Sequence, residues 1–325
     1  MFAATPTPGC CAYSTETRHL IAFERVGKTY RSLLGRRVVA VEDISFTITP
    51  GEVVGIAGPN GAGKSTLIAL LLGLLRPTTG NVTVDGTQPR AFVERRGVGY
   101  LPELIPLNPL WRADESLRRF AVLGGVPAAE VEKRVDDVIA RVGLAEHRRK
   151  RCKQLSKGNL QKVGLAQSLL RDEQLFVFDE PTHGLDPVWT ERFREIIREL
   201  RRADRAMLVA SHNLDELERI CDRVVIIDRG RIQRVVDLHT ASVEAPAVAY
   251  RIRVASGAPA LIAAFPGAKE ATRGDVIVPP VDLATLNKGL AHAIAGGTLI
   301  AGVAPDRSAL EREFHDAVRA PGGAA

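Results

Sequence analysis

Residues 52–66 of this chain, EVVGIAGPNGAGKST, decide the fold. Residues 52–57 are a short apolar strand, and the rest matches the phosphate-loop pattern G-x-x-x-x-G-K-[ST], called Walker A. Glycines let backbone N–H groups approach phosphates without a Cβ clash, and a helix starting near Lys64 adds positive dipole there. The pattern therefore predicts a nucleotide phosphate site made of Gly58, Pro59, Asn60, Gly61, Ala62, Gly63, Lys64, Ser65 and Thr66.

A second strand ends in two acidic residues. Residues 175–178 are apolar, and Asp179 and Glu180 follow them directly. Open α/β sheets bind ligands at the carboxyl ends of their strands, and successive strand residues point to opposite faces. The two carboxylates should therefore have different roles. Asp179 suits Mg²⁺ together with the Ser65 hydroxyl, and Glu180 suits the activation of an attacking water as general base.

Strands alternate with helices along most of the chain, which predicts a mainly parallel sheet. Residues 44–48 alternate like a half-buried strand, and residues 131–142 have helical apolar spacing after Pro127. Further strands are expected at 206–210 and 223–227, the latter in a hairpin with 231–235.

The composition divides the chain into three parts. Residues 1–18 are small and polar and predict a mobile N-terminal tail. Residues 19–236 carry every motif and are expected to form the ATP-binding domain. Residues 237–325 shift toward Ala, Pro and Gly and predict a small accessory α+β domain, with strands near 250–254, 276–278 and 297–303 and helices near 258–264, 283–294 and 308–318.

Four further motifs occur in the order typical of one family. Leu155-Ser156-Lys157-Gly158-Asn159-Leu160-Gln161 stands in the place of the LSGGQ signature, and Gly184-Leu185-Asp186 looks like a D-loop. His212 ends a strand as a switch histidine does, and Tyr30 matches an aromatic that stacks on adenine. Alone, each residue also suits a structural role, such as a helix cap for Ser156. Together, over about residues 20–236, they resemble the nucleotide-binding subunit of ABC transporters.

The resemblance implies a P-loop NTPase (RecA-like) α/β core with an antiparallel β subdomain and a helical subdomain. Its ligands would be ATP and Mg²⁺. The signature would hold the γ-phosphate of an ATP bound by the opposite subunit through Ser156 and Gly158, in a homodimer or heterodimer of ATP-binding subunits. Asp186 would cross that interface, and His212 would contact the γ-phosphate. The catalytic set would then be Lys64, Glu180 and His212.

Three residues depart from the family pattern. Lys157 and Asn159 replace a glycine and a glutamine of the signature, and Glu103 replaces the Q-loop glutamine. A carboxylate at Glu103 can still bind Mg²⁺. Related variants occur in subunits that pair with separate exporter-type permeases, so the resemblance points to export.

The bulk composition is that of a globular protein, with 45% hydrophobic and 25% charged residues. No apolar run is long enough to span a bilayer and no signal peptide is recognisable, so a separate transmembrane permease is expected as partner. The subunit is expected in the cytoplasm, peripheral at the inner face of the membrane. The net charge is +6, but the basic residues have no interleaved aromatic side chains that could stack on bases, so no nucleic-acid partner is expected. The four cysteines should be reduced thiols.

Two alternatives remain open at this point. The chain could be a soluble non-transport ABC ATPase, although relatives of that kind usually carry two cassettes or long coiled coils. It could also be a regulatory module that binds ATP without hydrolysing it, against which Glu180 and His212 argue.

Overall fold

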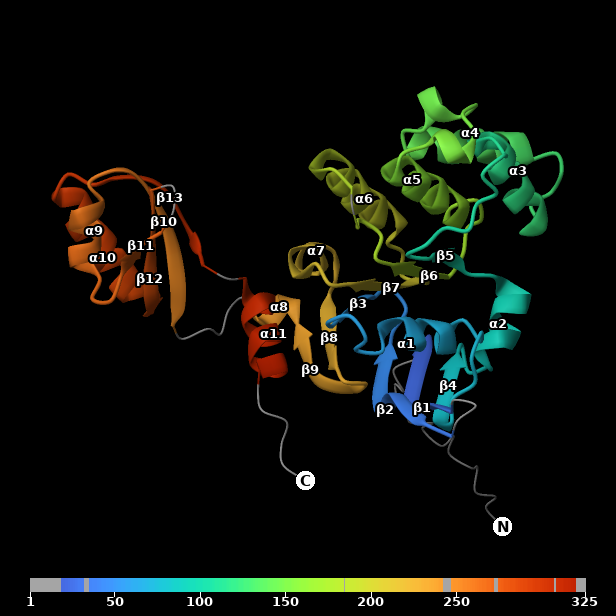
Figure 1. The fold of residues 1–325 in the computed structure, drawn as a ribbon, viewed down its shortest axis with the longest axis horizontal. Coiled ribbons are helices and arrows are strands. Elements are labelled where there is room, and N and C mark those ends of the chain that lie inside the picture. The colour runs from blue at the N-terminus through green and yellow to red at the C-terminus, as the bar shows by residue number, and fades with distance from the viewer. Residues whose placement is uncertain are drawn as a thin grey trace, which may run out of the picture.

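Six strands form a central sheet, and five of them run parallel (Figure 1). Across the sheet they follow the order β5 (Gly99–Leu101), β6 (Leu175–Asp179), β7 (Ala206–Ser211), β3 (Val53–Ala57), β8 (Arg223–Asp228) and β9 (Arg231–Asp237). β9 is antiparallel to β8 and forms the predicted hairpin with it. The computed structural model describes residues 19–31, 35–183, 185–241, 247–271, 274–306 and 308–319, so the predicted tail (1–18) and Gly184 lie outside it.

The central sheet is buried on both faces. All residues of β3, β6 and β7 are buried, which is typical of a parallel sheet covered by other elements on each side. Alternate residues of β6 belong to different cores: Phe176 and Phe178 pack into one cluster, and Leu175 and Val177 into the other. The sheet therefore separates two hydrophobic layers.

An antiparallel sheet covers one face. It pairs β1 (Ile21–Arg31) with β2 (Arg37–Ile48) and β4 (Thr79–Val84), and its core also contains residues from α1 (Lys64–Leu71) and α2 (Pro89–Arg96). α1 begins at Lys64, as predicted.

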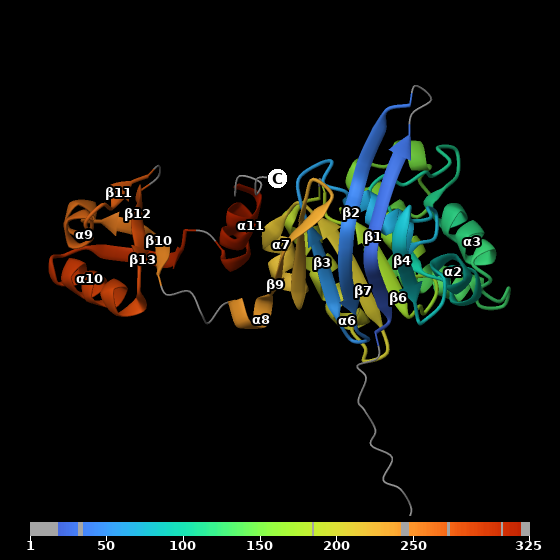
Figure 2. The ribbon, with the colours of Figure 1, turned by 90° about the horizontal axis from the view of Figure 1, so that it is seen from below.

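Helices cover the other face: Figure 1 shows them across the central sheet from β1 and β2, which lie toward the viewer in Figure 2. The core on this side includes residues of α3 (Ala113–Leu123), α4 (Val131–Arg141), α5 (Lys157–Ser168), α6 (Pro187–Leu200) and α7 (Leu214–Ile220). α4 confirms the helix predicted around residues 131–142. The α/β core, the antiparallel β subdomain and the helical subdomain are all as predicted.

The C-terminal α+β unit has a core of its own. Its chain order is β10 (Val248–Ser256), α9 (Ala258–Ala264), β11 (Lys269–Glu270), β12 (Asp275–Val281), α10 (Leu283–Ala295) and β13 (Leu299–Pro305). The sheet order β11-β12-β10-β13 is that of a split βαβ fold. Ile252, Phe265 and Val278 are buried in this separate core, and the unit stands beside the rest of the chain in Figure 1.

The last described helix returns to the central sheet. α11 (Ala309–Arg319) packs against α7, β8 and β9, and also contacts α8 (Leu238–Ala241). Leu310 is fully buried in the same cluster as the helices that cover the central sheet. An ion pair between Glu313 and Arg234 of β9 adds a polar contact. Part of the segment predicted as accessory therefore completes the core of the preceding residues.

Two further features concern the cysteines and the helices. Cys152 and Cys221 are buried free thiols. Among the residues placed by the structure, no helix combines the length and the apolar character needed to cross a bilayer.

Candidate active site

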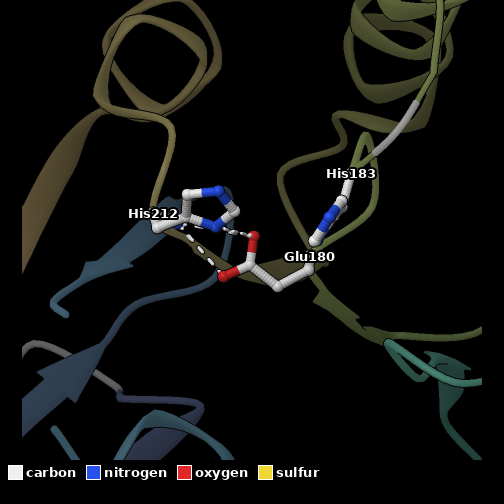
Figure 3. Close-up of side chains that lie close together, drawn as sticks. All are labelled: Glu180, His183 and His212. Carbon is white, nitrogen blue, oxygen red and sulfur yellow. Dashed lines mark hydrogen bonds and ion pairs between the residues drawn. The ribbon is translucent and has the colours of Figure 1, made fainter. Parts of the chain in front are cut away.

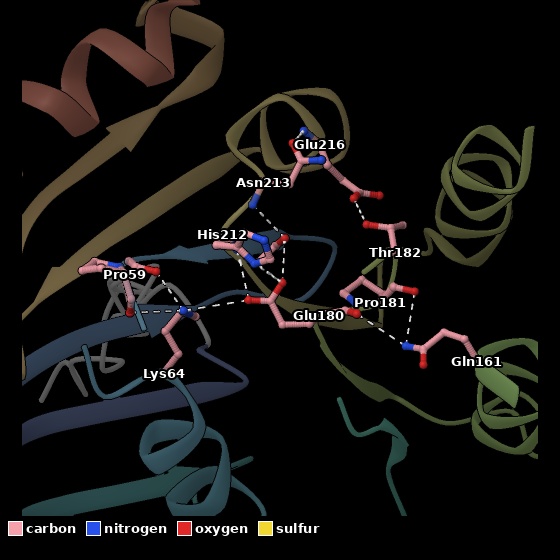
Figure 4. A network of polar contacts seen from close by, with 11 residues as sticks. Pro59, Lys64, Gln161, Glu180, Pro181, Thr182, His212, Asn213 and Glu216 are labelled. Carbon is pink, nitrogen blue, oxygen red and sulfur yellow. Dashed lines mark hydrogen bonds and ion pairs between the residues drawn. The ribbon is translucent and has the colours of Figure 1, made fainter. Parts of the chain in front are cut away.

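Three neighbouring strands bring the predicted catalytic residues together. β6, β7 and β3 lie side by side and run parallel, so their carboxyl ends meet at one edge of the sheet. β6 delivers Asp179 and Glu180, β7 delivers His212, and β3 leads into the loop that starts at Gly58. Figure 4 shows Lys64, Glu180 and His212 converging at this edge.

The phosphate loop needs glycine at particular points. Gly63 has a φ of 112°, and a Cβ atom there would lie 2.8 Å from the carbonyl oxygen of Ala40. At Gly58 a Cβ atom would lie 2.4 Å from the carbonyl oxygen of Ile227. Any side chain at either position would therefore collide with backbone. The Lys64 ammonium donates to the carbonyl oxygens of Gly58 (2.8 Å) and Pro59 (3.4 Å), which holds it over the loop.

A cavity of about 430 Å³ opens above this loop, a volume within the range of small-molecule sites. Most of the predicted site residues line it. They are Asn60, Gly61, Ala62, Gly63, Lys64, Ser65, Thr66, Glu103, Asp179, Glu180 and His212.

Asp179 is only 5% exposed, and its carboxyl group lies among other charges. Burial, together with the nearby carboxylates of Glu180 and Glu103, raises its pKa to about 6, while Lys64 and a hydrogen bond from Ser65 act in the opposite direction. A divalent cation would relieve the repulsion between these carboxylates. The hydroxyl of Ser65 and the carboxylates of Asp179 and Glu103 are hard oxygen donors, which fit Mg²⁺.

Glu180 lies just beyond β6 in a left-handed backbone conformation, with a φ of 49°. This φ ends the alternation of the strand, so Glu180 lines the same cavity as Asp179. Its Oε2 lies 2.7 Å from Nδ1 of His212, and its Oε1 accepts a hydrogen bond from the His212 backbone N–H (3.1 Å). Oε1 also lies 3.8 Å from the Lys64 ammonium. Glu180 therefore joins Lys64 to His212.

The signature segment forms a second cavity. Ser156 caps α5, and its hydroxyl accepts a hydrogen bond from the backbone N–H of Asn159 at 3.3 Å. This cavity of about 410 Å³ is lined by Ser156, Lys157, Gly158, Asn159, Lys162, Leu185 and Asp186. It shares none of these residues with the first cavity. Within one chain, the signature and the phosphate loop thus line separate cavities.

Three predicted residues, Gly58, Pro59 and Tyr30, line neither cavity, and Asp186 has a further local role. Tyr30 lies on β1, is 40% exposed, and has the Lys28 ammonium 5.5 Å from its ring centre. Asp186 lines the second cavity, but its carboxylate also caps α6 by accepting from the backbone N–H of Trp189 at 2.8 Å.

Two further residues join the site without having been assigned a role from the sequence. The Gln161 amide donates to the carbonyl oxygens of Glu180 and Pro181, both at 3.4 Å, and so connects α5 to the acidic strand end (Figure 4). Its place in the second turn of the signature helix is a signal that could have found it. His183 borders the first cavity. The pairing of β6 with β7 brings His183 near His212, and the sequence does not reveal that pairing.

The glycine loop lies between a strand and a helix, and acidic residues follow a strand two places away in the sheet. This combination defines a P-loop nucleotide hydrolase. Comparison with known proteins narrows the class. The family model described as "ABC transporter" matches residues 41–183. A model described as "AAA domain, putative AbiEii toxin, Type IV TA system" matches residues 151–218.

Curated relatives extend the match. The ABC transporter ATP-binding protein NatA of Bacillus subtilis is 40% identical over 199 residues, which cover 60% of this chain and 80% of the relative. A methionine import ATP-binding protein of Pseudomonas putida is 35% identical, covering 66% of each chain. The Nod factor export ATP-binding protein I of Rhizobium etli is also 35% identical, covering 65% of this chain and 66% of the relative's.

A solved structure agrees with these relatives. A dimeric ATP-binding cassette bound to ADP and Pi in a post-hydrolysis state superposes with a TM-score of 0.62 at 25% identity, covering 67% of this chain and 98% of that one. The chain belongs to the ATP-binding subunits of ABC transporters. It binds and hydrolyses ATP.

Proposed function

We propose that this subunit powers export through a separate transmembrane permease, by ATP-driven closure of two ATP-binding subunits on each other. The observation that carries the proposal is the separation of the two cavities: the phosphate loop lines one, and Ser156, Gly158 and Asp186 line the other. A second subunit placed head to tail would bring each signature to the facing phosphate loop. Each ATP would then be enclosed by both subunits.

Within each composite site the residues have distinct roles. Lys64 binds the β- and γ-phosphates, and backbone N–H groups of the glycine loop surround them. Ser65, Asp179 and Glu103 hold Mg²⁺, which neutralises charge on the phosphates. Tyr30 stacks on the adenine.

Glu180 takes the proton of the attacking water. The hydrogen bond to His212 and the nearby Lys64 ammonium orient its carboxylate. His212 lines the cavity above the phosphate loop, where it would contact the γ-phosphate and respond to its loss. The helix start at Ser156 and Gly158 stabilises the same phosphate from the opposite subunit.

A complementation experiment tests the composite site. One variant carries Lys64→Ala and Glu180→Gln, and the other carries Ser156→Arg and Glu180→Gln; Glu180→Gln alone is the reference because it should trap ATP. Either double variant alone should trap no ATP. A mixture should form dimers with one intact site and trap one ATP per dimer. Absence of trapped ATP in the mixture, with two ATP per dimer in the reference, would refute the head-to-tail arrangement.

Export is supported by the similarity to the Nod factor export protein and by the departures at Glu103, Lys157 and Asn159 from the usual motifs. The direction is tested by reconstituting the subunit with its co-purified permease in vesicles and following ATP-dependent movement of the cargo. Accumulation on the side of the ATP-binding subunits would show import and overturn this part of the proposal.

The subunit would work at the inner face of the membrane, bound to that permease.

We also propose the division into an ATP-binding domain (19–236) and an accessory domain (237–325), which contributes to dimer stability or regulation. The separate core of residues 248–305 supports this role. Its test is an internal deletion of residues 247–306 that keeps α11, because removal of everything after Leu238 would also expose the core that Leu310 covers. Unchanged dimerisation and ATPase rate would contradict it.

A further inference from the structure

Three metal-binding side chains converge at the active-site edge of the sheet. Glu180 directly follows β6, His183 lies in the turn after it, and His212 directly follows β7 (Figure 3). Each offers a ligand atom, and these atoms all lie within 4.8 Å of one another. The backbone N–H of His183 donates to the carbonyl oxygen of Glu180 at 3.3 Å, so a tight turn brings this imidazole back toward the carboxylate.

The spacing suits a small dication. In a tetrahedral site with metal–ligand distances of about 2.0–2.1 Å, neighbouring ligand atoms are roughly 3.4 Å apart. The ligand atoms here are close enough to adopt that spacing: Nδ1 of His212 is 2.7 Å from Oε2 of Glu180, and all the ligand atoms lie within 4.8 Å of one another. His183 is exposed and His212 is half exposed, so small side-chain rotations are sufficient to adjust both imidazoles.

We propose that Glu180, His183 and His212 form a binding site for a transition-metal dication of the Zn²⁺ type, and that occupation of this site stops ATP hydrolysis. Two imidazoles and one carboxylate with a free fourth position are a ligand set that Zn²⁺ and Co²⁺ accept. The site differs from the oxygen donors Ser65, Asp179 and Glu103, which suit Mg²⁺.

The main opposing charge is the Lys64 ammonium. It lies 3.8 Å from Oε1 of Glu180, whereas the imidazole of His212 contacts Oε2. A metal ion bound at Oε2 therefore leaves the ion pair at Oε1 in place. The ion takes the place of the hydrogen bond between His212 and Glu180.

The effect on hydrolysis depends on the proposed function. A metal-bound Glu180 carboxylate cannot take a proton from the attacking water, and a metal-bound His212 cannot turn toward a phosphate. His183 borders the ATP cavity but is assigned no step of the hydrolysis, so its replacement should remove the response to the metal without abolishing hydrolysis.

The first experiment measures metal binding without nucleotide. Co²⁺ is titrated into the full-length chain, in a background with Cys10→Ser and Cys11→Ser so that these two thiols cannot bind the metal, and the visible d–d absorption of tetrahedral Co²⁺ is followed. Because loss of even an outer partner of a metal ligand weakens affinity roughly 10- to 100-fold, His183→Gln should weaken Co²⁺ binding by about 100-fold or more. His239→Gln is the matched control, since this exposed imidazole pairs with Asp222 instead, and it should bind like the background. Equal binding by His183→Gln and the background would overturn the proposal.

The second experiment measures ATPase activity with Mg²⁺ and buffered free Zn²⁺. Each rate is expressed relative to the rate of the same protein without Zn²⁺, because His183 borders the ATP cavity. With Zn²⁺ the background should lose activity and His183→Gln should keep it; equal inhibition of both would overturn the proposal. If His183-dependent metal binding occurs but the ATPase rate does not change, the metal site is supported and the role of Glu180 in hydrolysis is contradicted. The two experiments thus separate failure of the metal site from failure of the proposed function.

Discussion

Replacement of Leu310 by alanine tests whether α11 is part of the ATPase core. Leu310 is fully buried, in the same cluster as Leu217 and Ile220 of α7. Shortening a buried leucine to alanine loses apolar contacts and leaves a cavity, at a cost of about 2–5 kcal/mol. Each kcal/mol lowers Tm by roughly 2–4 °C in a domain of about 150–250 residues. Leu310→Ala should therefore lower the Tm of the nucleotide-free protein by at least about 4 °C.

The assay is thermal unfolding, followed by calorimetry at a fixed protein concentration. Leu299→Ala is the matched control, because Leu299 is 63% exposed on the edge strand β13. An exposed substitution of this kind usually changes stability by no more than about 0.5 kcal/mol. If the two variants have the same Tm, α11 does not pack on the ATPase core in solution and the reasoning is refuted.

Three more predictions concern the site. Burial and the neighbouring carboxylates raise the pKa of Asp179 to about 6 from 3.8, so the folded state binds more protons and loses stability as pH rises through this window. Asp179→Asn, which stays neutral, should therefore gain urea resistance relative to wild type at pH 7.5 but not at pH 3.5; a constant difference would contradict the assigned pKa. Gly63→Ala should abolish ATP binding, because the new Cβ meets the carbonyl oxygen of Ala40 at 2.8 Å. Gly86 has a φ of 67° and open space around it, so the control Gly86→Ala should cost only about 1–2 kcal/mol of stability. Isothermal calorimetry measures the ATP binding of both variants, and urea unfolding measures their stability. Gln161→Ala loses two hydrogen bonds to the backbone at Glu180 and Pro181. At about 0.5–1.5 kcal/mol per bond, kcat should fall roughly tenfold with little change in ATP affinity. An unchanged kcat would show that these hydrogen bonds do not position Glu180.

The fold was largely predictable because its signals are local. The glycine loop after β3 and the apolar strand before Asp179 are contiguous in sequence, and both predict their structures. Strand β4 was not predicted, since Gly80 and Asn81 interrupt its apolar alternation. The return of α11 was also missed, because amphipathic spacing shows that a helix has a buried face but not which surface buries it.

The candidate site was predictable as far as its motifs extend. Alternation along β6 predicts different roles for Asp179 and Glu180, but it does not predict that both line one cavity. That outcome depends on the left-handed φ of Glu180, which sequence patterns do not reveal for a non-glycine residue. His183 was missed for a related reason, since its neighbour His212 comes from a different strand.

The packing of α11 has a consequence for how the protein is made. Leu310 belongs to the same core as Val53, so synthesis on the ribosome has to add most of the chain before this core is complete. At translation rates of about 5–20 residues per second, the nascent ATPase unit would wait several seconds for its last helix. During that interval the apolar surface on α7 that Leu310 later covers is available to chaperones.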